Sequence, residues 1–153
     1  MATLIAMHGY PRSGKSTIAR ELSKQYGAPI VNRDNIRLAL HGQTYAAVAE
    51  PMTRAIYKIM IHSLFLAGHE YVIADETHWS RAARDFVRDG PWDTQFYWVL
   101  TNDYECIRRA QATNQPWLVP VIEEMSLRHE PLEDDEPRFK VFDIITKEAL
   151  NEV

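Results

Sequence analysis

Gly9-Tyr10-Pro11-Arg12-Ser13-Gly14-Lys15-Ser16-Thr17 is the stretch that decides the fold expected for this chain. It matches the pattern G-x-x-x-x-G-K-[ST], the phosphate-binding P-loop. The glycines let successive backbone N–H groups turn toward phosphate oxygens, and the helix that follows adds its dipole. Lys15 is expected to reach the β- and γ-phosphates, and Ser16 to ligate magnesium. The motif therefore predicts a nucleoside triphosphate site, with contacts from Gly9 and from residues 12–17.

Arg12 is unusual within this loop, where small residues are the rule. Its guanidinium group is able to clamp a phosphate of the nucleotide or of an acceptor, or to point at solvent. The sequence leaves both roles open.

The surroundings of the motif predict an α/β fold. Apolar runs indicate buried strands at 3–7, 30–32, 71–74, 96–100 and 141–145. Helical spacing and capping residues indicate helices at 15–26, 35–40, 52–67, 80–89 (with Ser80 as N-cap), 103–112 (capped by Asp103), 120–129 and 146–153. Because helices join the strands, we expect a P-loop NTPase fold whose mostly parallel sheet has about five strands and helices on both faces. The stripe of helix 52–67 expected to face the core is Ile56, Ile59, Met60, Ser63 and Ala67.

Length and composition indicate one domain over residues 1–153, since 46% of the 153 residues are apolar and 25% are charged. The single cysteine, Cys106, excludes an intrachain disulfide. The sequence shows no leader or membrane span, so a cytoplasmic location is expected. The net charge is −4, but residues 1–40 alone carry +4. This argues against a protein that coats DNA and leaves room for a local phosphate site.

Charged residues follow the strands on either side of the P-loop strand, where ligands bind in an open parallel sheet. Strand 30–32 is followed by Arg33 and Asp34, and strand 71–74 by Asp75 and Glu76. Asp75 is expected to hold magnesium through water, the alternative being that it caps the next turn. Asp34 suits a general base for an acceptor hydroxyl, with Arg37 holding the acceptor. The alternative for Asp34 and Arg37 is a plain surface ion pair.

A lid is expected at about 108–129, where the polar stretch 111–116 separates two helices. Arg108 and Arg109 precede that stretch. An arginine there is able to enter the site on closure and offset the charge that develops during transfer. The alternative is that both are cations at a helix end. Trp79 and Trp117 are candidates for stacking on a base, and the acidic segment 130–137 is expected to be a solvated surface loop.

With the P-loop, the segments 31–37 and 73–78 and the two-helix lid in this order, the chain resembles the kinase domain of phage-type polynucleotide 5′-kinases. The most specific part is Asn32-Arg33-Asp34, followed by Arg37. The resemblance implies that Asp34 is the general base for a 5′-hydroxyl and that Arg37 contacts the phosphate of the acceptor. It likewise implies roles for Lys15, for Ser16 and, as the first lid arginine, for Arg109.

Two departures from that family are visible. Its second lid arginine falls at Thr113 here, so the transition-state charge is left to Arg109, or to Arg12. The segments 130–136 and 139–145 look more like the endings of a broader group of small P-loop kinases, some of which phosphorylate other hydroxyl acceptors.

The sequence therefore predicts a kinase that uses ATP and Mg²⁺ to phosphorylate the 5′-hydroxyl end of DNA or RNA. A GTPase is disfavoured, because no N-K-x-D tetrad follows strand 96–100. A kinase for a small molecule or a modified base stays open, as does a nucleotide-binding module without catalysis. The six histidines show no metal-ligand spacing. The sequence does not fix the oligomeric state.

Overall fold

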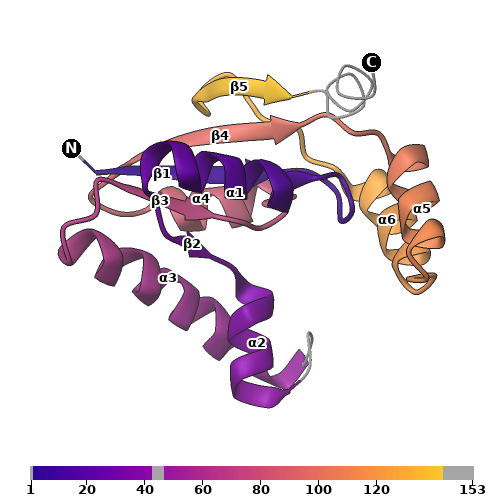
Figure 1. Cartoon of the computed structure of the whole chain (residues 1–153), viewed down its shortest axis with the longest axis horizontal. Helices are drawn as coiled ribbons and strands as arrows, with labels where there is room; N and C mark the ends of the chain where they lie inside the picture. The colour runs from indigo at the N-terminus through magenta and orange to yellow at the C-terminus, as the bar shows by residue number, and fades with distance from the viewer. Residues whose placement is uncertain (1, 43–46, 143–153) are drawn as a thin grey trace.

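The structure, a computed structural model, describes residues 2–42 and 47–142. Within these residues, parallel strands form one five-stranded sheet in the order β2-β3-β1-β4-β5 (Figure 1). The strands are β1 (Thr3–His8), β2 (Ile30–Val31), β3 (Tyr71–Ala74), β4 (Asp93–Val99) and β5 (Arg138–Phe142). Since β3 pairs directly with β1, the P-loop after β1 and the residues after β3 lie at the same edge of the sheet.

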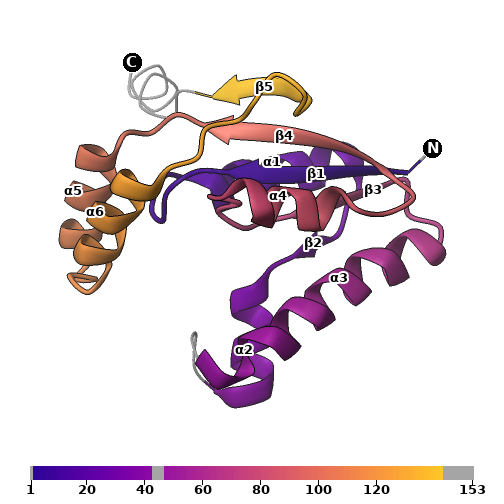
Figure 2. The same ribbon diagram turned by 180° about the vertical axis from the view of Figure 1, so that it is seen from behind.

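Helices cover both faces of the sheet, as predicted (Figures 1 and 2). They are α1 (Lys15–Tyr26), α2 (Arg33–His41), α3 (Glu50–Leu66), α4 (Arg81–Arg88), α5 (Asp103–Ala112) and α6 (Leu118–Arg128), with a 3-10 turn η1 (Ala47–Ala49) before α3. In β1, Leu4 and Ala6 join the core under α3 and α4, while Ile5 and Met7 join the core under α1. Burial on both faces explains why β1 reads as one continuous apolar run.

The predicted boundaries hold for α1, β3 and α5 and shift elsewhere. β4 begins at Asp93 rather than at Phe96, because the polar residues 93–95 pair with residues 3–5 of β1 although they do not read as an apolar strand. β5 begins at Arg138 rather than at residue 141, and residues 143–145 of the predicted strand lie outside the described residues. The predicted helix 146–153 lies outside the described residues.

Asparagine and serine side chains set the starts of three helices. Asn32 accepts hydrogen bonds from the N–H groups of Asp34 and Asn35, so α2 begins at Arg33. Ser80 caps α4, as predicted. The prediction that Asp103 caps α5 is wrong, because the cap is Asn102, whose side chain accepts from the N–H group of residue 105 at 2.9 Å.

Of the predicted stripe of α3, Ile56 packs against the core, but the rest of the buried face differs from the one predicted. Its buried residues are Thr53, Tyr57 and Ile61, at four-residue steps, whereas Ile59 is 63% exposed and Met60 is 40% exposed. The reason is that apolar residues surround most of this helix, so their spacing alone does not select one face. Tyr57 adds a specific contact, because its hydroxyl lies 3.1 Å from Nε2 of the buried His78 in the segment after β3.

The acidic segment 130–137 is largely exposed, as predicted, but one of its carboxylates is buried. Glu136 is 1% exposed and forms a 2.6 Å ion pair with the fully buried Arg84 of α4. Arg81 of the same helix binds Glu133 and Asp135, each at 2.6 Å. Glu136 is therefore buried against α4 because the buried Arg84 requires a charged partner, whereas Glu133 and Asp135 form exposed ion pairs with Arg81.

α5 and α6 lie side by side at the end of the sheet toward which the strands point (Figures 1 and 2). They pack through Cys106 and Ala110 of α5 and Ile122 of α6. This places the helix pair over the edge that carries the P-loop. Among the described residues, no helix combines the length and apolar character needed to cross a bilayer.

Candidate active site

The P-loop lies between β1 and α1, the strand and helix that the motif requires. Gly14 has a φ of 92°, and a Cβ atom at Gly9 would lie 2.9 Å from the Ser13 hydroxyl, so both positions favour glycine. Arg12 also has a left-handed backbone, with a φ of 65°. These conformations shape the loop into a cradle of backbone N–H groups.

The P-loop borders a cationic cavity of about 310 Å³. Its lining residues are Arg12, Gly14, Lys15, Ser16, Thr17, Arg20 and Arg109. Four of them are basic, and the described residues that line it include no carboxylate. The sequence had not singled out Arg20, which lies one helical turn after Ser16 and thus on the same side of α1. A cavity of this charge fits the phosphates of a nucleotide.

Asp75 lies against the first turn of α1 and is 5% exposed. Ser16 donates a hydrogen bond from Oγ to its Oδ2 atom at 2.8 Å, while Oδ1 is buried without a partner among the described residues. The side chain of Asn32 donates to the Asp75 carbonyl at 3.0 Å, which ties the ends of β2 and β3 together. An unpaired carboxylate oxygen next to a hydroxyl fits Mg²⁺, which takes one or two protein groups plus phosphates and water. The residues present therefore fit the metal site expected at Ser16 and Asp75.

Asp34 and Arg37 meet as an ion pair, at 2.6 Å between Oδ1 and a guanidinium nitrogen. Asp34 keeps an exposed side chain, at 59%, whereas Arg37 is buried. Glu50 of α3 binds Arg37 through both oxygens, at 2.7 and 2.8 Å. Hydrogen bonds from Arg37 lower the pKa of Glu50, and those to Glu50 raise the pKa of Arg37. Arg37 thus orients Asp34 here, and Glu50, which the sequence did not single out, fixes Arg37. The contact expected between Arg37 and an acceptor stays a prediction.

Arg109 joins α5 to the P-loop. It donates to Glu105 at 2.9 Å and to the backbone oxygen of Arg12 at 3.3 Å. Arg108, which is 66% exposed at its side chain, also binds Glu105 but does not line the phosphate cavity. Hydrogen bonds from Arg108 and Arg109 lower the pKa of Glu105 to about 2. Thr113 bonds to the Arg109 carbonyl at 2.7 Å and brings no charge to the site.

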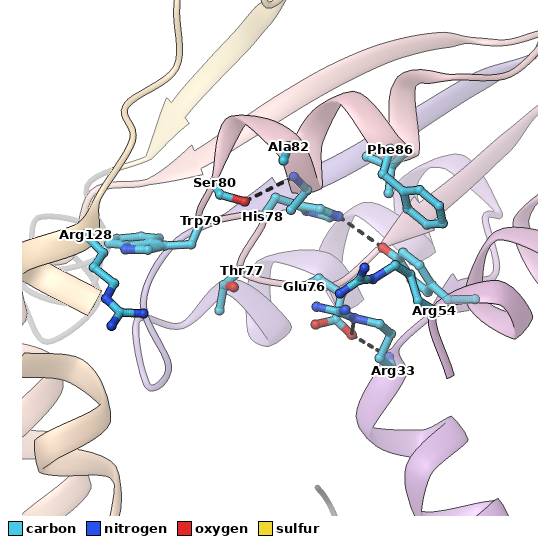
Figure 3. Close-up of a pocket in the computed structure, with 13 residues that line it drawn as sticks. Arg33, Arg54, Glu76, Thr77, His78, Trp79, Ser80, Ala82, Phe86 and Arg128 are labelled. Atoms are coloured by element: carbon cyan, nitrogen blue, oxygen red, sulfur yellow. Dashed lines mark hydrogen bonds and ion pairs between the residues drawn. The ribbon is translucent and has the colours of Figure 1, made fainter. Parts of the chain in front are cut away.

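A second cavity, of about 500 Å³, opens beyond the ends of β2 and β3 (Figure 3). Its lining residues are Arg33, Arg54, Tyr57, Glu76, Thr77, His78, Trp79, Ser80, Ala82, Ala83, Phe86, Val87 and Arg128. The cavity combines three arginines and one carboxylate with an apolar wall from α4. Burial raises the pKa of Glu76, and the charge of Arg33 opposes that shift.

Aromatic rings pack around Trp79, which lines the second cavity. Trp79 packs against Tyr10 of the P-loop at 4.4 Å and against His129 at 4.0 Å, and its N–H group donates to the carbonyl of Met125. Trp79 thus contacts protein rings rather than standing free for a base. Trp117, the other stacking candidate, is 64% exposed and lines neither cavity.

Two histidines near these rings are buried, His8, which stacks on Trp79 at 5.2 Å, and His78. His8 bonds to the carbonyl of His78 at 2.8 Å and to His129 at 2.9 Å between their Nε2 atoms. His78 contacts the hydroxyl of Tyr57 at 3.1 Å. Burial lowers the pKa of His8 to about 3 and that of His78 to about 4. Both are therefore neutral at physiological pH and structural in character.

A parallel α/β sheet, a P-loop after its central strand and a serine–aspartate pair beside that loop define a P-loop kinase-like domain. Residues 4–119 match a family model described as an AAA domain, and the chain belongs to that family. No curated protein sequence matches the chain.

Solved structures share this fold. Kti12 of Chaetomium thermophilum, in complex with ADP-AlF3, superposes with a TM-score of 0.70 at 15% identity, covering 97% of this chain and 96% of that one. A gluconokinase from Sinorhizobium meliloti 1021 gives 0.67 at 19% identity, covering 97% and 90%. A chain of the Pnkp1/Rnl/Hen1 complex gives 0.62 at 28% identity, covering 71% of this chain and 38% of that one. The comparisons support the kinase fold and leave the acceptor undetermined.

Proposed function

We propose that this protein is a kinase that transfers the γ-phosphate of ATP, with Mg²⁺, to the 5′-hydroxyl end of a polynucleotide. The observation that carries phosphoryl transfer is the Ser16–Asp75 hydrogen bond at the border of the cationic P-loop cavity. The metal, when bound, neutralises phosphate oxygens.

In this proposal, each part of the phosphoryl transfer is assigned to particular residues of the chain. Lys15 and the P-loop N–H groups hold the triphosphate, and Arg109 offsets charge on the transferring group. Asp34 accepts the proton of the acceptor hydroxyl, the hydroxyl oxygen bonds to the γ-phosphorus, and ADP leaves. Its 59% exposure leaves Asp34 accessible to an acceptor, and Arg37 holds its carboxylate in place.

Three observations favour a polynucleotide end as the acceptor. The Asn32–Arg37 segment lies at the end of β2, beside Asp75. Arg33, Arg54 and Arg128 line the second cavity, where they suit a phosphodiester. The chain is also 28% identical to a chain of the Pnkp1/Rnl/Hen1 complex over 71% of its length.

A small hydroxyl compound is the second candidate. The observation that favours it is the size of the second cavity, because about 500 Å³ matches a typical small-molecule site. A polynucleotide would place only its terminal unit in such a space.

One experiment separates the candidates. Radiolabelled ATP is incubated with a 5′-hydroxyl oligonucleotide, with a nucleoside, or with no acceptor, and Lys15→Ala serves as the inactive control. Label on the oligonucleotide supports the proposal, and label only on the small acceptor supports the second candidate. Label on neither acceptor would favour a nucleotide-binding module without kinase activity.

A further inference from the structure

The second cavity contains a carboxylate that the proposed transfer step does not use. Glu76 follows Asp75 directly, and its side chain is 11% exposed. Its Oε1 atom accepts the backbone N–H group of Arg33 and lies 3.4 Å from the Nε atom of the same residue. Glu76 lines the cavity, where Figure 3 shows it beside Arg33. Glu76 therefore offers a hydrogen-bond acceptor to a molecule in the cavity.

Glu76 also lies close to the proposed general base. Arg33, which binds Glu76, directly precedes Asp34 in the chain. Arg33 and Glu76 both line the cavity, so Asp34 lies next in the chain to its wall. An acceptor with its hydroxyl at Asp34 and its remainder in the cavity would lie beside Glu76.

The chemistry of the cavity narrows the kind of acceptor. A carboxylate repels a phosphate and binds hydroxyl groups, which donate hydrogen bonds to it. The three arginines of the same cavity suit an anionic group. The cavity thus fits a unit that carries both a hydroxyl donor and a phosphate. At the 5′ end of a polynucleotide, the sugar hydroxyl other than the one phosphorylated is the 2′-hydroxyl, which DNA lacks.

Resting on the proposed function, we infer that Glu76 accepts a hydrogen bond from the 2′-hydroxyl of the terminal ribose and makes the enzyme prefer RNA ends. Glu76 is a specificity-determining residue in this scheme, and Asp34 remains the base. A buried group built to bond a substrate hydroxyl rejects the analogue that lacks it, because the group is then left unpaired.

The test compares two 5′-hydroxyl oligoribonucleotides that differ only in a ribose or a 2′-deoxyribose at the first position. The wild-type protein is expected to prefer the ribose end in kcat/KM by roughly 10–100-fold. Glu76→Ala is expected to lower the rate on the ribose end much more than the rate on the deoxyribose end. Glu70→Ala is the matched control, since Glu70 is an exposed glutamate at the opposite end of β3, and both rates should keep their wild-type values.

Equal wild-type rates on the two ends would overturn the inference, and this comparison does not depend on any variant folding. An equal fall on both ends in Glu76→Ala would show that Glu76 only supports Arg33, which also overturns it. Transfer to neither oligonucleotide would instead refute the proposed function itself, so the two failures are distinguishable.

Discussion

The hydroxyl of Ser16 donates a hydrogen bond to Asp75 at 2.8 Å and so joins the first turn of α1 to the end of β3. The second oxygen of Asp75 is buried without a partner among the described residues. Burying such an atom unpaired is costly, so the arrangement is suited to a bound metal or its water.

Asp75→Asn should therefore weaken the metal requirement specifically. We expect the Mg²⁺ concentration for half-maximal ATP turnover to rise roughly 10–100-fold, with folding intact. A magnesium titration at saturating ATP measures this. Asp89→Asn is the control, because Asp89 is an exposed carboxylate paired only with Lys58 among the contacts of the described residues. An unchanged titration in Asp75→Asn would exclude Asp75 from the metal site.

Asp34→Ala should separate ATP binding from transfer. Removing the base is expected to lower the transfer rate roughly 10²–10⁴-fold while the affinity for ATP stays nearly the same, because Asp34 lies outside the phosphate cavity. Equilibrium binding of a fluorescent ATP analogue and the labelled transfer assay give the two values. Wild-type transfer by this variant would contradict the general-base assignment.

Glu50→Ala should reduce both stability and transfer, since it leaves the buried Arg37 with Asp34 as its remaining carboxylate partner. The free energy of unfolding is expected to fall by about 1–3 kcal/mol, measured by urea denaturation. Asp134→Ala, at an exposed ion pair with Arg138, should cost under about 0.5 kcal/mol. Equal effects of the two changes would mean that Glu50 does not fix Arg37.

Arg109 and Arg108 form a natural matched pair, because both bind Glu105 but only Arg109 lines the phosphate cavity. Arg109→Ala is expected to lower kcat on the order of 10³-fold, and Arg108→Ala to change it little. Steady-state kinetics of the two variants provide the comparison. Similar losses in both would point to Glu105 and the stability of α5 rather than to charge in the site.

Lowering the pH should begin to destabilise the protein at pH values well above those at which carboxylates titrate. Burial lowers the pKa of His8 to about 3 and of His78 to about 4, below the ordinary value of 6.5. The unfolded chain therefore binds protons first, and stability falls as the pH drops below 6.5, by about 1.4 kcal/mol per pH unit for each histidine. The pKa of Glu76 is raised, so the folded state binds this proton more readily than the unfolded chain does. This one group therefore offsets part of the loss of stability. Urea midpoints that stay constant between pH 7 and pH 5 would contradict the prediction.

The sequence predicted the parts of the site that local rules define. The P-loop is a contiguous motif, and Asp75 follows from the rule that ligands bind beyond strand ends. The partnership of Arg37 with Glu50 was not predictable, since no spacing rule links residues 13 positions apart in different helices. The burial of Glu136 was missed for the same reason, because its partner Arg84 is 52 residues away.

The buried face of α3 could not be predicted from the sequence for a different reason. Apolar residues occur around much of this helix, and the side that is buried depends on where Tyr57 meets His78 across the core. The spacing of apolar residues predicts that α3 is a helix, but it carries no information on which residues pack against it. The predicted buried face therefore differs from the observed one.

The position of Trp79 has a practical consequence. Its indole ring lies between Tyr10 of the P-loop and His129 at the end of α6, and its N–H group is bonded to α6. Indole fluorescence responds to changes in such neighbours. Any movement of α6 relative to the phosphate-binding loop would alter the emission of Trp79, so this ring would report on the position of α6.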